Sequence, residues 1–446
     1  MRLPVLITLC LFSALALSGS PVAEQEVASS STTRILHCGS LLVDAAQAPR
    51  ESVSLVVQDG RVVEIVEGFV TTVDGVESEP ELVDLRDRFV LPGLIDCHVH
   101  LTSESVPVDE RVRRALQETE AYAAIDGVVY AERTLFAGFT TVRDLGSAGS
   151  TAIALRDRIN SGLVRGPRML VSGPSISVTG GHADWTNSFS PALRPELGPD
   201  QMTADGPSEA RKAVRARIRE GVDVIKITAT GGVLSMTAAG LEQQFFEDEL
   251  EAICEAATRM GRKVAAHAHG ADGIKAALRA GVSSIEHGTY LDDEAIALFR
   301  ESGAYLVPTV HAGKYVAQQA EIPGFYPPAI RLKAKAVGPL IQEALARAHK
   351  AGVQVAFGTD CGVGAHGTNA LELIYMEEAG MTPSECLVAA TSNAADLCGM
   401  GEELGTLEPG RLADVIAVRE NPLENLRTLS DVPFVMKEGQ VYRNER

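Results

Sequence analysis

The chain has 446 residues, 45% of them hydrophobic, and a formal net charge of -19 at pH 7. A chain of this length buries a large core and exceeds an average single domain, which favours one large domain with a smaller companion. The acidic excess opposes binding to phosphate backbones and to anionic membrane surfaces, so a nucleic-acid partner is not expected.

The N-terminal residues have the layout of a secretory signal. A basic Arg2 precedes an apolar run over residues 3–17, and three small residues follow at positions 18–20. The run is short for a bilayer span, as it is in signal sequences. We therefore predict a signal peptide over residues 1–23, export to the periplasm or the outside of the cell, and no stable membrane insertion after cleavage.

The cysteines beyond this segment show no C-x-x-C spacing. They are Cys38, Cys97, Cys254, Cys361, Cys386 and Cys398. A chain this large needs no covalent staples, so we interpret them as mostly buried thiols. In an oxidising compartment, one disulfide between two of them is nevertheless an alternative.

Both ends of the remaining chain are expected to form short strands. Residues 54–65 form two apolar runs around Asp59-Gly60, a dipeptide typical of tight hairpin turns. Residues 405–418 and 434–442 again have the pattern of strands. We therefore predict one small β-sandwich built from residues 24–88 and 405–446, which keeps both ends beside the central domain.

The central residues 89–404 alternate between apolar strands, polar or glycine-rich loops and amphipathic helices. Helical patterns occupy, for example, residues 247–260 and 273–280, and residues 360–405 have a helical composition. Repeated strand–helix units form a parallel sheet, and eight of them fit a closed (β/α)8 TIM barrel of the α/β class. The predicted strands run over residues 90–97, 140–144, 168–177, 223–228, 263–268, 283–286, 304–310 and 354–358.

Strand one ends with two histidines, His98 and His100, one residue apart. Side chains at positions i and i+2 of a strand project from the same face, so both imidazoles can reach one metal ion. An H-x-H pair alone also occurs as ordinary polar side chains at the exposed end of a strand. Other metal-capable residues at the carboxyl ends of strands, where barrel chemistry gathers, favour the metal site. They are Lys226 on strand four, His267 and His269 at the end of strand five, His287 after strand six and Asp360 after strand eight.

Lys226 needs a special state to serve a metal site. A protonated ammonium cannot bind a metal, so Lys226 would have to be unprotonated and carboxylated by carbon dioxide to a bridging carbamate. Its apolar neighbours Val224, Ile225 and Ile227 favour burial, and a buried lysine without a partner loses its charge. From these residues alone, a salt bridge at the strand end remains the alternative.

Taken in chain order, these motifs resemble those of the amidohydrolase superfamily of metal-dependent hydrolases. They are Leu91-Pro92-Gly93-Leu94-Ile95-Asp96-Cys97-His98-Val99-His100, Lys226, Ala266-His267-Ala268-His269-Gly270, Ile285-Glu286-His287-Gly288-Thr289 and Gly358-Thr359-Asp360. The resemblance is closest to the imidazolonepropionase-like branch with prolidase-type dipeptidases, Lys/Arg-type carboxypeptidases and ochratoxinase. It extends over residues 33–446.

The resemblance implies a role for each of these residues. His98, His100 and Asp360 would hold the more buried of two divalent metal ions, His267 and His287 the more exposed one, and Lys226, as N6-carboxylysine, would bridge them. Asp360 would also take a proton from the bridging hydroxide and pass it to the leaving amine. The family's motif favours His267 over His269 as the ligand, although both share one face of the strand. Zinc is the expected metal, and the ligand chemistry leaves cobalt and manganese open.

Four further residues are candidates for substrate binding. His182 lies on a glycine-rich loop after strand three, where it could equally bond to nearby backbone. Tyr290 and His311 follow strands six and seven at the catalytic end of the barrel. Arg143 on strand two could bind a substrate carboxylate, but it could as easily pair with Asp144.

These features together predict an exported enzyme with a binuclear metal centre. The resemblance implies cleavage, by metal-bound hydroxide, of the C-terminal amide bond of dipeptides or N-acyl amino acids, and its branch often forms homo-oligomers. Cyclic amides or esters are the alternative substrates, because barrel loops rather than metal ligands decide the substrate. A barrel that has lost catalysis and serves as an interaction scaffold is the other class, and the complete ligand set argues against it.

Overall fold

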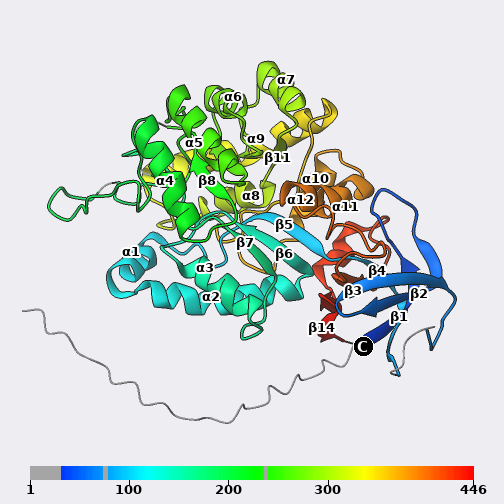
Figure 1. Ribbon diagram of the computed structural model, residues 1–446. Coiled ribbons are helices and arrows are strands. Elements are labelled where there is room, and N and C mark those ends of the chain that lie inside the picture. Colours follow the sequence, from blue (N-terminus) through cyan, green and yellow to red (C-terminus); the bar gives the residue numbers. More distant parts are fainter. Residues whose placement is uncertain (1–31, 74–78, 188, 236–239, 446) are drawn as a thin grey trace, which may run out of the picture.

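The computed structural model describes residues 32–73, 79–187, 189–235 and 240–445. The predicted signal peptide lies outside these residues. Figure 1 shows two parts, an α/β part made by the middle of the chain and a sheet made by both of its ends. Among the described helices, none has the length and apolar character needed to cross a membrane.

Strands from both ends of the chain form one mixed sheet of seven strands. β4 lies between its parallel partner β1 and its antiparallel partner β12, so backbone hydrogen bonds join the two ends of the chain (Figure 1). The strand order is β14 (Gln440–Asn444), β13 (Phe434–Lys437), β12 (Val415–Val418), β4 (Glu81–Pro92), β1 (Thr33–Leu41), β2 (Arg50–Gln58) and β3 (Arg61–Glu67).

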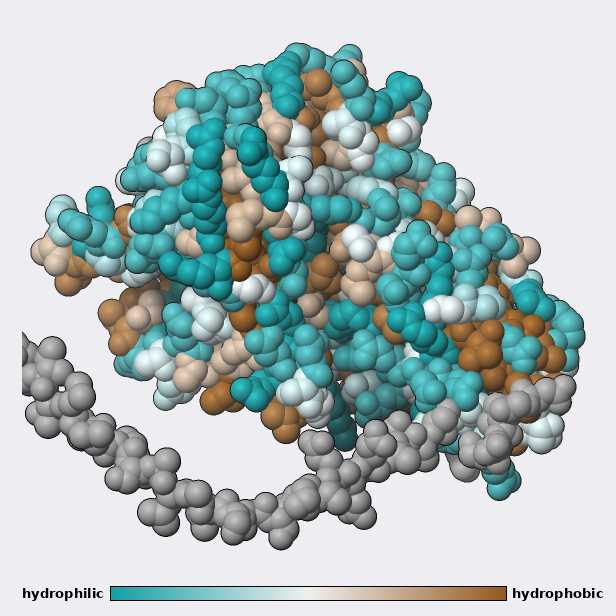
Figure 2. Space-filling model, in the orientation of Figure 1, coloured by the Kyte–Doolittle hydropathy of each residue, from teal (hydrophilic) through white to brown (hydrophobic). Residues whose placement is uncertain are grey.

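The predicted hairpin is confirmed in this sheet. β2 pairs antiparallel with β3, and Asp59 and Gly60 at the turn have φ angles of 49° and 81°. Two consecutive left-handed residues match the twist of the flanking strands, which is why Asp-Gly is favoured there. Figure 2 shows hydrophobic residues gathered over this sheet, and Val63, Phe69 and Leu82 are among its exposed apolar side chains.

The middle of the chain contains two parallel sheets. β5, β6, β8, β9 and β10 are buried along their whole length, which explains their nearly continuous apolar sequence. The three-stranded sheet has the order β5 (Leu94–Val99), β6 (Phe139–Asp144) and β7 (Arg168–Val171). The four-stranded sheet has the order β11 (Tyr305–Val307), β10 (Ser284–His287), β9 (Val264–Ala268) and β8 (Ile225–Thr228).

Further parallel bridges connect the edges of these two sheets. Cys97 N also donates a hydrogen bond of 2.9 Å to Phe357 O, between β5 and the segment that follows α9. The result is a TIM-barrel-like α/β arrangement in which strand ends meet on one side. The bridges pair Ile176 with Ile227, Leu306 with Val355 and Val99 with Cys361.

Helices connect and surround the parallel strands (Figure 1). α7 shows how the sequence sets their ends: the Asp292 carboxylate accepts a hydrogen bond from Ala295 N, and Gly303 follows the helix with a φ of 69°. The helices are α1 (Val108–Gln117), α2 (Glu120–Phe136), α3 (Thr151–Asn160), α4 (Pro207–Arg219), α5 (Glu247–Arg259), α6 (Ala271–Ala280), α7 (Asp293–Ser302), α8 (Val310–Gln319), α9 (Pro328–Lys350), α10 (Leu371–Glu378), α11 (Pro383–Ala390) and α12 (Ser392–Leu397), and a 3-10 helix covers Leu426–Ser430.

Several of the strand predictions need correction. The strand predicted over residues 168–177 ends at Val171, and the one predicted over residues 304–310 ends at Val307, before α8 begins at Val310. The predicted strand over residues 90–97 is two strands, because β4 ends at Pro92 and β5 begins at Leu94. Gly93 lies between them, and a Cβ atom there would stand 2.2 Å from Thr140 Oγ1. The predicted strand over residues 354–358 holds an isolated bridge at Val355 in place of a strand. Its backbone hydrogen bonds are divided between neighbouring strands and loops.

Candidate metal centre and active site

Most of the predicted site residues line one cavity of about 170 Å³ at the carboxyl ends of the parallel strands. β5, β9 and β10 end at or beside the histidines that they carry, so strand direction alone brings these side chains together. The polar groups that line the cavity include His98, His100, His182, Lys226, His267, His269, His287 and Asp360.

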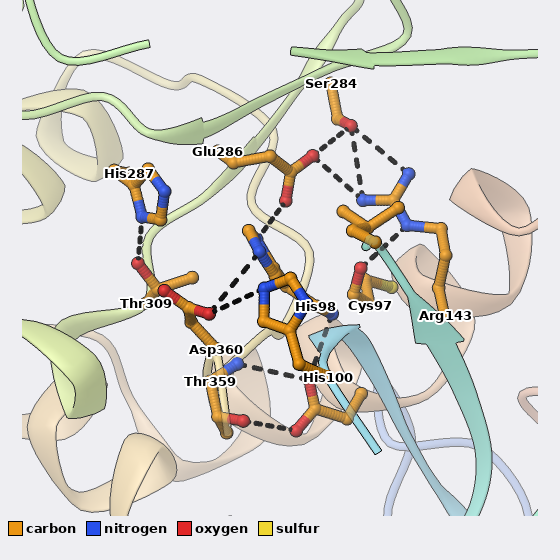
Figure 3. A network of polar contacts seen from close by, with 12 residues as sticks. Cys97, His98, His100, Arg143, Ser284, Glu286, His287, Thr309, Thr359 and Asp360 are labelled. Atoms are coloured by element: carbon orange, nitrogen blue, oxygen red, sulfur yellow. Dashed lines mark hydrogen bonds and ion pairs between the residues drawn. The ribbon is translucent and has the colours of Figure 1, made fainter. Parts of the chain in front are cut away.

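The first group of side chains consists of His98, His100 and Asp360. Their ligand atoms lie within 4.8 Å of one another. Asp360 Oδ1 is 3.1 Å from His100 Nε2 and 3.6 Å from His98 Nε2 (Figure 3). Burial would raise the pKa of Asp360, but the two imidazoles lower it below its ordinary value. This carboxyl group therefore stays ionised beside two nitrogen donors.

A buried charge network supports this first group from behind. His98 Nδ1 lies 2.9 Å from Glu286 Oε2, and Arg143 Nη2 donates to Glu286 Oε1 at 3.0 Å (Figure 3). Arg143 Nε also donates to Cys97 O at 2.7 Å. Burial opposes ionisation of Glu286, yet the Arg143 guanidinium lowers its pKa to about 2. The ionised Glu286 fixes the orientation of the His98 ring, as carboxylates behind metal-binding histidines do.

The expectation that Arg143 contacts a substrate carboxylate is therefore corrected. Arg143 is only 1% exposed and does not line the cavity. Its donors are directed to Glu286, to Ser284 Oγ and to the backbone of β5. Arg143 neutralises Glu286 and positions the strand that carries His98.

The second group consists of His267, His269 and His287, whose ligand atoms also lie within 4.8 Å of one another. Hydroxyl groups, rather than charges, support two of these rings: His287 Nδ1 is 2.6 Å from Thr309 Oγ1, and His269 Nδ1 is 2.7 Å from Thr289 Oγ1. Burial lowers the pKa of His267 and His287 well below the ordinary value, and that of His269 to about 3. These rings are neutral, which is the form that binds metals.

Lys226 lies on β8 in the wall of the cavity, 4% exposed. Its Nζ has no hydrogen-bond partner among the residues that the structure describes. Burial lowers its pKa to about 8, so an unprotonated amine is accessible near neutral pH. Lys226 lines the same cavity as His98, His267 and His287, so its side chain borders the space that both groups share.

The remaining substrate-binding candidates have different surroundings. His182 lines the cavity, its ring stacked on His267 with centroids 4.2 Å apart, and its buried Nδ1 has no partner in the described part of the chain. His311 is buried beside the cavity, with Nε2 2.9 Å from Thr368 Oγ1. Tyr290 is 40% exposed and is not among the residues that line the cavity. His182 therefore keeps its predicted place, whereas Tyr290 does not face the site.

The backbone is strained at three positions around the site. His287, Thr309 and Asp360 have φ angles of 74°, 55° and 58°, a left-handed conformation that costs non-glycine residues on the order of 1–3 kcal/mol each. Each of these residues carries or supports a proposed ligand. Strain concentrated in this way is typical of functional sites held by a rigid scaffold.

The sequence interpretation did not include the supporting residues Glu286 and Asp96. Asp96 accepts hydrogen bonds from His98 N and from Thr359 N, each at 3.1 Å, and so ties β5 to the segment that carries Asp360. The available signal was the occurrence of Asp and Glu inside otherwise apolar strands, because buried carboxylates need partners. That signal marks a role without naming the partner.

The donor set fits two divalent metal ions. Imidazole nitrogens and carboxylate oxygens suit zinc, cobalt and manganese, and several rings use Nδ1 for a protein partner, as metal-binding histidines almost always do. The Lys226 Nζ, buried and without a partner among the described residues in the same cavity, is the observation that a purely structural cluster leaves unexplained. The ligand His267 and the alternative His269 both remain in the second group.

Comparisons with known proteins agree with this geometry. The profile described as "Amidohydrolase family" matches residues 89–442. Ochratoxinase from Aspergillus niger is 34% identical over 437 residues, which are 92% of this chain and 86% of the relative.

Solved structures are similar over almost the whole chain. A crystal structure of a Xaa-Pro dipeptidase with methionine bound in the active site has a TM-score of 0.88 and 42% identity, covering 93% of this chain and 100% of the other. A prolidase complexed with N-methylphosphonate-L-proline has a TM-score of 0.83 and 31% identity, with the same two coverages.

Proposed function

Because the chain belongs to the amidohydrolase family of metal-dependent hydrolases that act on amide or peptide bonds, we propose that it cleaves the C-terminal amide bond of dipeptides or N-acyl amino acids with two divalent metal ions. The names of its relatives, ochratoxinase and Xaa-Pro dipeptidase, support an amide with a free amino acid on one side. Zinc is the proposed metal.

The proposal of two metals rather than one rests on Lys226. Its buried side chain lines the cavity that the histidine–carboxylate group and the histidine group also line, and Asp360 supplies the one carboxylate among the described lining residues. The unprotonated amine adds to carbon dioxide, a new N–C bond forms, and the displaced proton leaves to solvent. The product carbamate would supply an anionic ligand, which would offset part of the charge of two divalent cations in a buried site.

His98, His100 and Asp360 would hold one metal, and His267 and His287 the other. When bound, the metals supply a water of lowered pKa and polarise the scissile carbonyl. Asp360 would take a proton from the attacking water and pass it to the nitrogen of the leaving amine. His182, stacked on His267 at the cavity wall, is positioned to hydrogen-bond a substrate oxygen through its unpartnered nitrogen.

Several wider features belong to the same proposal. The edge-to-edge bridges between the parallel sheets support a closed (β/α)8 barrel. A further bridge between Arg61 and Leu412 supports a sheet that folds over itself as a sandwich. Export through the N-terminal signal and assembly as a homo-oligomer are proposed from the sequence and its resemblance.

A substrate screen tests the reaction. The metal-replete protein, supplied with bicarbonate, is offered dipeptides and N-acyl amino acids with proline, basic, aromatic or aliphatic C-terminal residues, and free amino acid is measured. We expect release from at least one class, and a loss of about 10²–10⁴-fold in kcat for Asp360→Asn. The exposed Asp272→Asn on α6 is the control.

Metal content separates the two ways in which the screen can fail. Two metals per chain with no turnover of any amino acid derivative would reject the substrate class and turn attention to cyclic amides and esters. Fewer than one metal per chain, with no turnover, would reject the binuclear centre and favour an interaction scaffold.

A further inference from the structure

The cavity that holds the histidines has a second, apolar wall. Besides the polar groups, it is lined by aliphatic side chains, chiefly Val316 on α8, Val337 and Ile341 on α9, and Leu145, Val233 and Val363 on loops. Its volume of about 170 Å³ is close to the roughly 150 Å³ of an apolar cavity that accommodates benzene. One face of the cavity therefore offers apolar contacts to a group bound beside the metal ligands.

Two glycines bring this wall into place. Gly313 on α8 faces Gly338 on α9, and a Cβ atom at position 338 would stand 2.5 Å from Gly313 O. The helices thus approach closely only because neither position has a side chain. Their close packing presents Val316 and Ile341 to the cavity as one continuous surface.

The cavity offers no free counter-charge for a basic side chain. Among the described residues that line it, Asp360 supplies the one carboxylate, and that group already lies 3.1 Å from His100 Nε2. The neutral imidazoles supply no counter-charge, and the two proposed divalent metal ions would repel a further cation. A buried charge without a partner is strongly disfavoured, whereas an apolar side chain gains by leaving water.

We propose that Val316, Val337 and Ile341 form a specificity wall that selects substrates with an apolar residue on one side of the scissile amide and rejects basic and acidic residues. This inference rests on the proposed amide hydrolysis and names the side chain that the reaction prefers. It separates the protein from relatives of the same branch that act on basic C-terminal residues.

The two sides of the scissile amide meet different surroundings. A second cavity, of about 1240 Å³, shares His100, Leu234 and Val363 with the first and is lined by side chains of both charges, including Glu104 and Arg111. A group that extends into this larger space is not restricted in length or polarity. Selection is therefore strict on one side of the bond and weak on the other.

A matrix of substrates tests the proposal. kcat/KM is measured for the metal-loaded protein with N-acyl dipeptides in which leucine, methionine, phenylalanine, glutamate, lysine or arginine occupies each side of the cleaved amide in turn. We expect at least about a 10²-fold preference for the apolar residues over the charged ones, on one side only. The proposal would be overturned if kcat/KM for lysine or arginine substrates lies within tenfold of that for leucine substrates on both sides of the amide.

A binding measurement keeps this test separate from the proposed reaction. Free leucine and methionine are expected to raise the melting temperature of the metal-loaded protein, and free lysine to leave it unchanged. If no amide is hydrolysed, the proposed function fails. A higher melting temperature with leucine and methionine, but not with lysine, would still support the specificity wall. Equal shifts by leucine and lysine would reject the wall even where hydrolysis occurs.

Variants in the wall assign the selection to these residues. Val316→Asp is expected to increase the kcat/KM ratio of lysine to leucine substrates at least tenfold, while Leu332→Asp, at a 73% exposed position of α9, leaves it unchanged. If Val316→Asp does not fold, Ile341→Ala serves as the test. It enlarges the cavity and should raise the ratio of kcat/KM for phenylalanine substrates to that for alanine substrates severalfold. An unchanged ratio in the folded variant would exclude the wall.

Discussion

Two buried glutamates on opposite sides of the site show how differently the same side chain is held. Glu286, behind His98, is paired with Arg143, and its pKa is lowered to about 2. Glu372 on α10 accepts hydrogen bonds from Val310 N and His311 N at the start of α8, and burial raises its pKa to about 8. Both are fully buried, so the arginine accounts for the difference.

The comparison extends to the two histidine groups. The first, with His98, is supported by a full ion pair, whereas the second, with His287, is supported by the hydroxyl of Thr309, next to the helix start that Glu372 caps. A charged support polarises its ligand more strongly than a neutral hydroxyl does. We infer that the first group holds its metal more tightly than the second.

Replacement of Lys226 should have the largest effect, because this residue serves both groups. Lys226→Met is expected to lose most of both metals and to reduce turnover by more than the roughly 10–100-fold typical of a supporting residue. Metal analysis and kcat check this. Lys263→Met, just before β9 and bonded to Asp396 O at 2.7 Å, is the matched control, and retention of two metals by the Lys226 variant would contradict the bridge.

Removal of the arginine should be the largest change in stability. Arg143→Met leaves Glu286 as an unpaired buried charge, which we expect to lower the free energy of unfolding by about 3–5 kcal/mol. Denaturant unfolding measures it. Arg211→Met, which breaks the half-exposed pair with Glu255, should cost no more than about 1 kcal/mol. Addition of Glu286→Gln to Arg143→Met should recover part of the loss, and a purely additive double variant would contradict the pairing.

The hydroxyl supports should have a smaller, metal-specific effect. Thr309→Val removes the partner of His287 Nδ1 and is expected to weaken one of two metals about 10–100-fold, as measured by competition with a chelator. Thr309→Ser retains the hydroxyl and should bind normally. Thr289→Val, beside His269, should change little if His267 is the ligand, and an equal loss in both valine variants would assign His269 to the metal.

A further expected effect is a pH dependence carried by Glu372. Its folded pKa of about 8 exceeds the ordinary value of 4.5, so the folded state binds the proton more tightly than the unfolded state does. Its contribution to stability is complete below pH 4.5 and is lost as the pH rises to about 8. Melting temperatures between pH 5 and 8.5 should therefore fall less steeply in Glu372→Gln than in the parent, and parallel curves would reject the assignment.

The sequence predicted which side chains line the cavity better than it predicted what supports them. His98, His100, His267 and His287 stood out because strand periodicity puts them on one face and at one end of parallel strands. The role of Arg143 could not be read in this way, because the choice between a substrate and Glu286 depends on which strands lie side by side. Contacts between side chains of different sheets, such as Arg143 on β6 with Glu286 on β10, are set by tertiary packing and leave no local pattern.

The strand boundaries were limited by a similar problem. Residues 89–95 are apolar on both sides of Gly93, since the end of β4 is covered in one sheet and β5 in another. Only the close approach of Thr140 requires a glycine at the junction, and that approach is invisible in the sequence. The Asp59-Gly60 turn, by contrast, was predictable because its chemistry is local.

The position of β4 between β1 and β12 also determines when the site can mature. The strand that carries His98 continues directly from β4, whose hydrogen-bonded neighbour β12 begins only at Val415. During synthesis on the ribosome, nearly the entire polypeptide must therefore emerge before β4 has hydrogen-bonded neighbours on both sides. A truncated translation product that stops before Val415 lacks the pairing of β4 with β12. We expect such a product to be degraded by proteases rather than to bind metal.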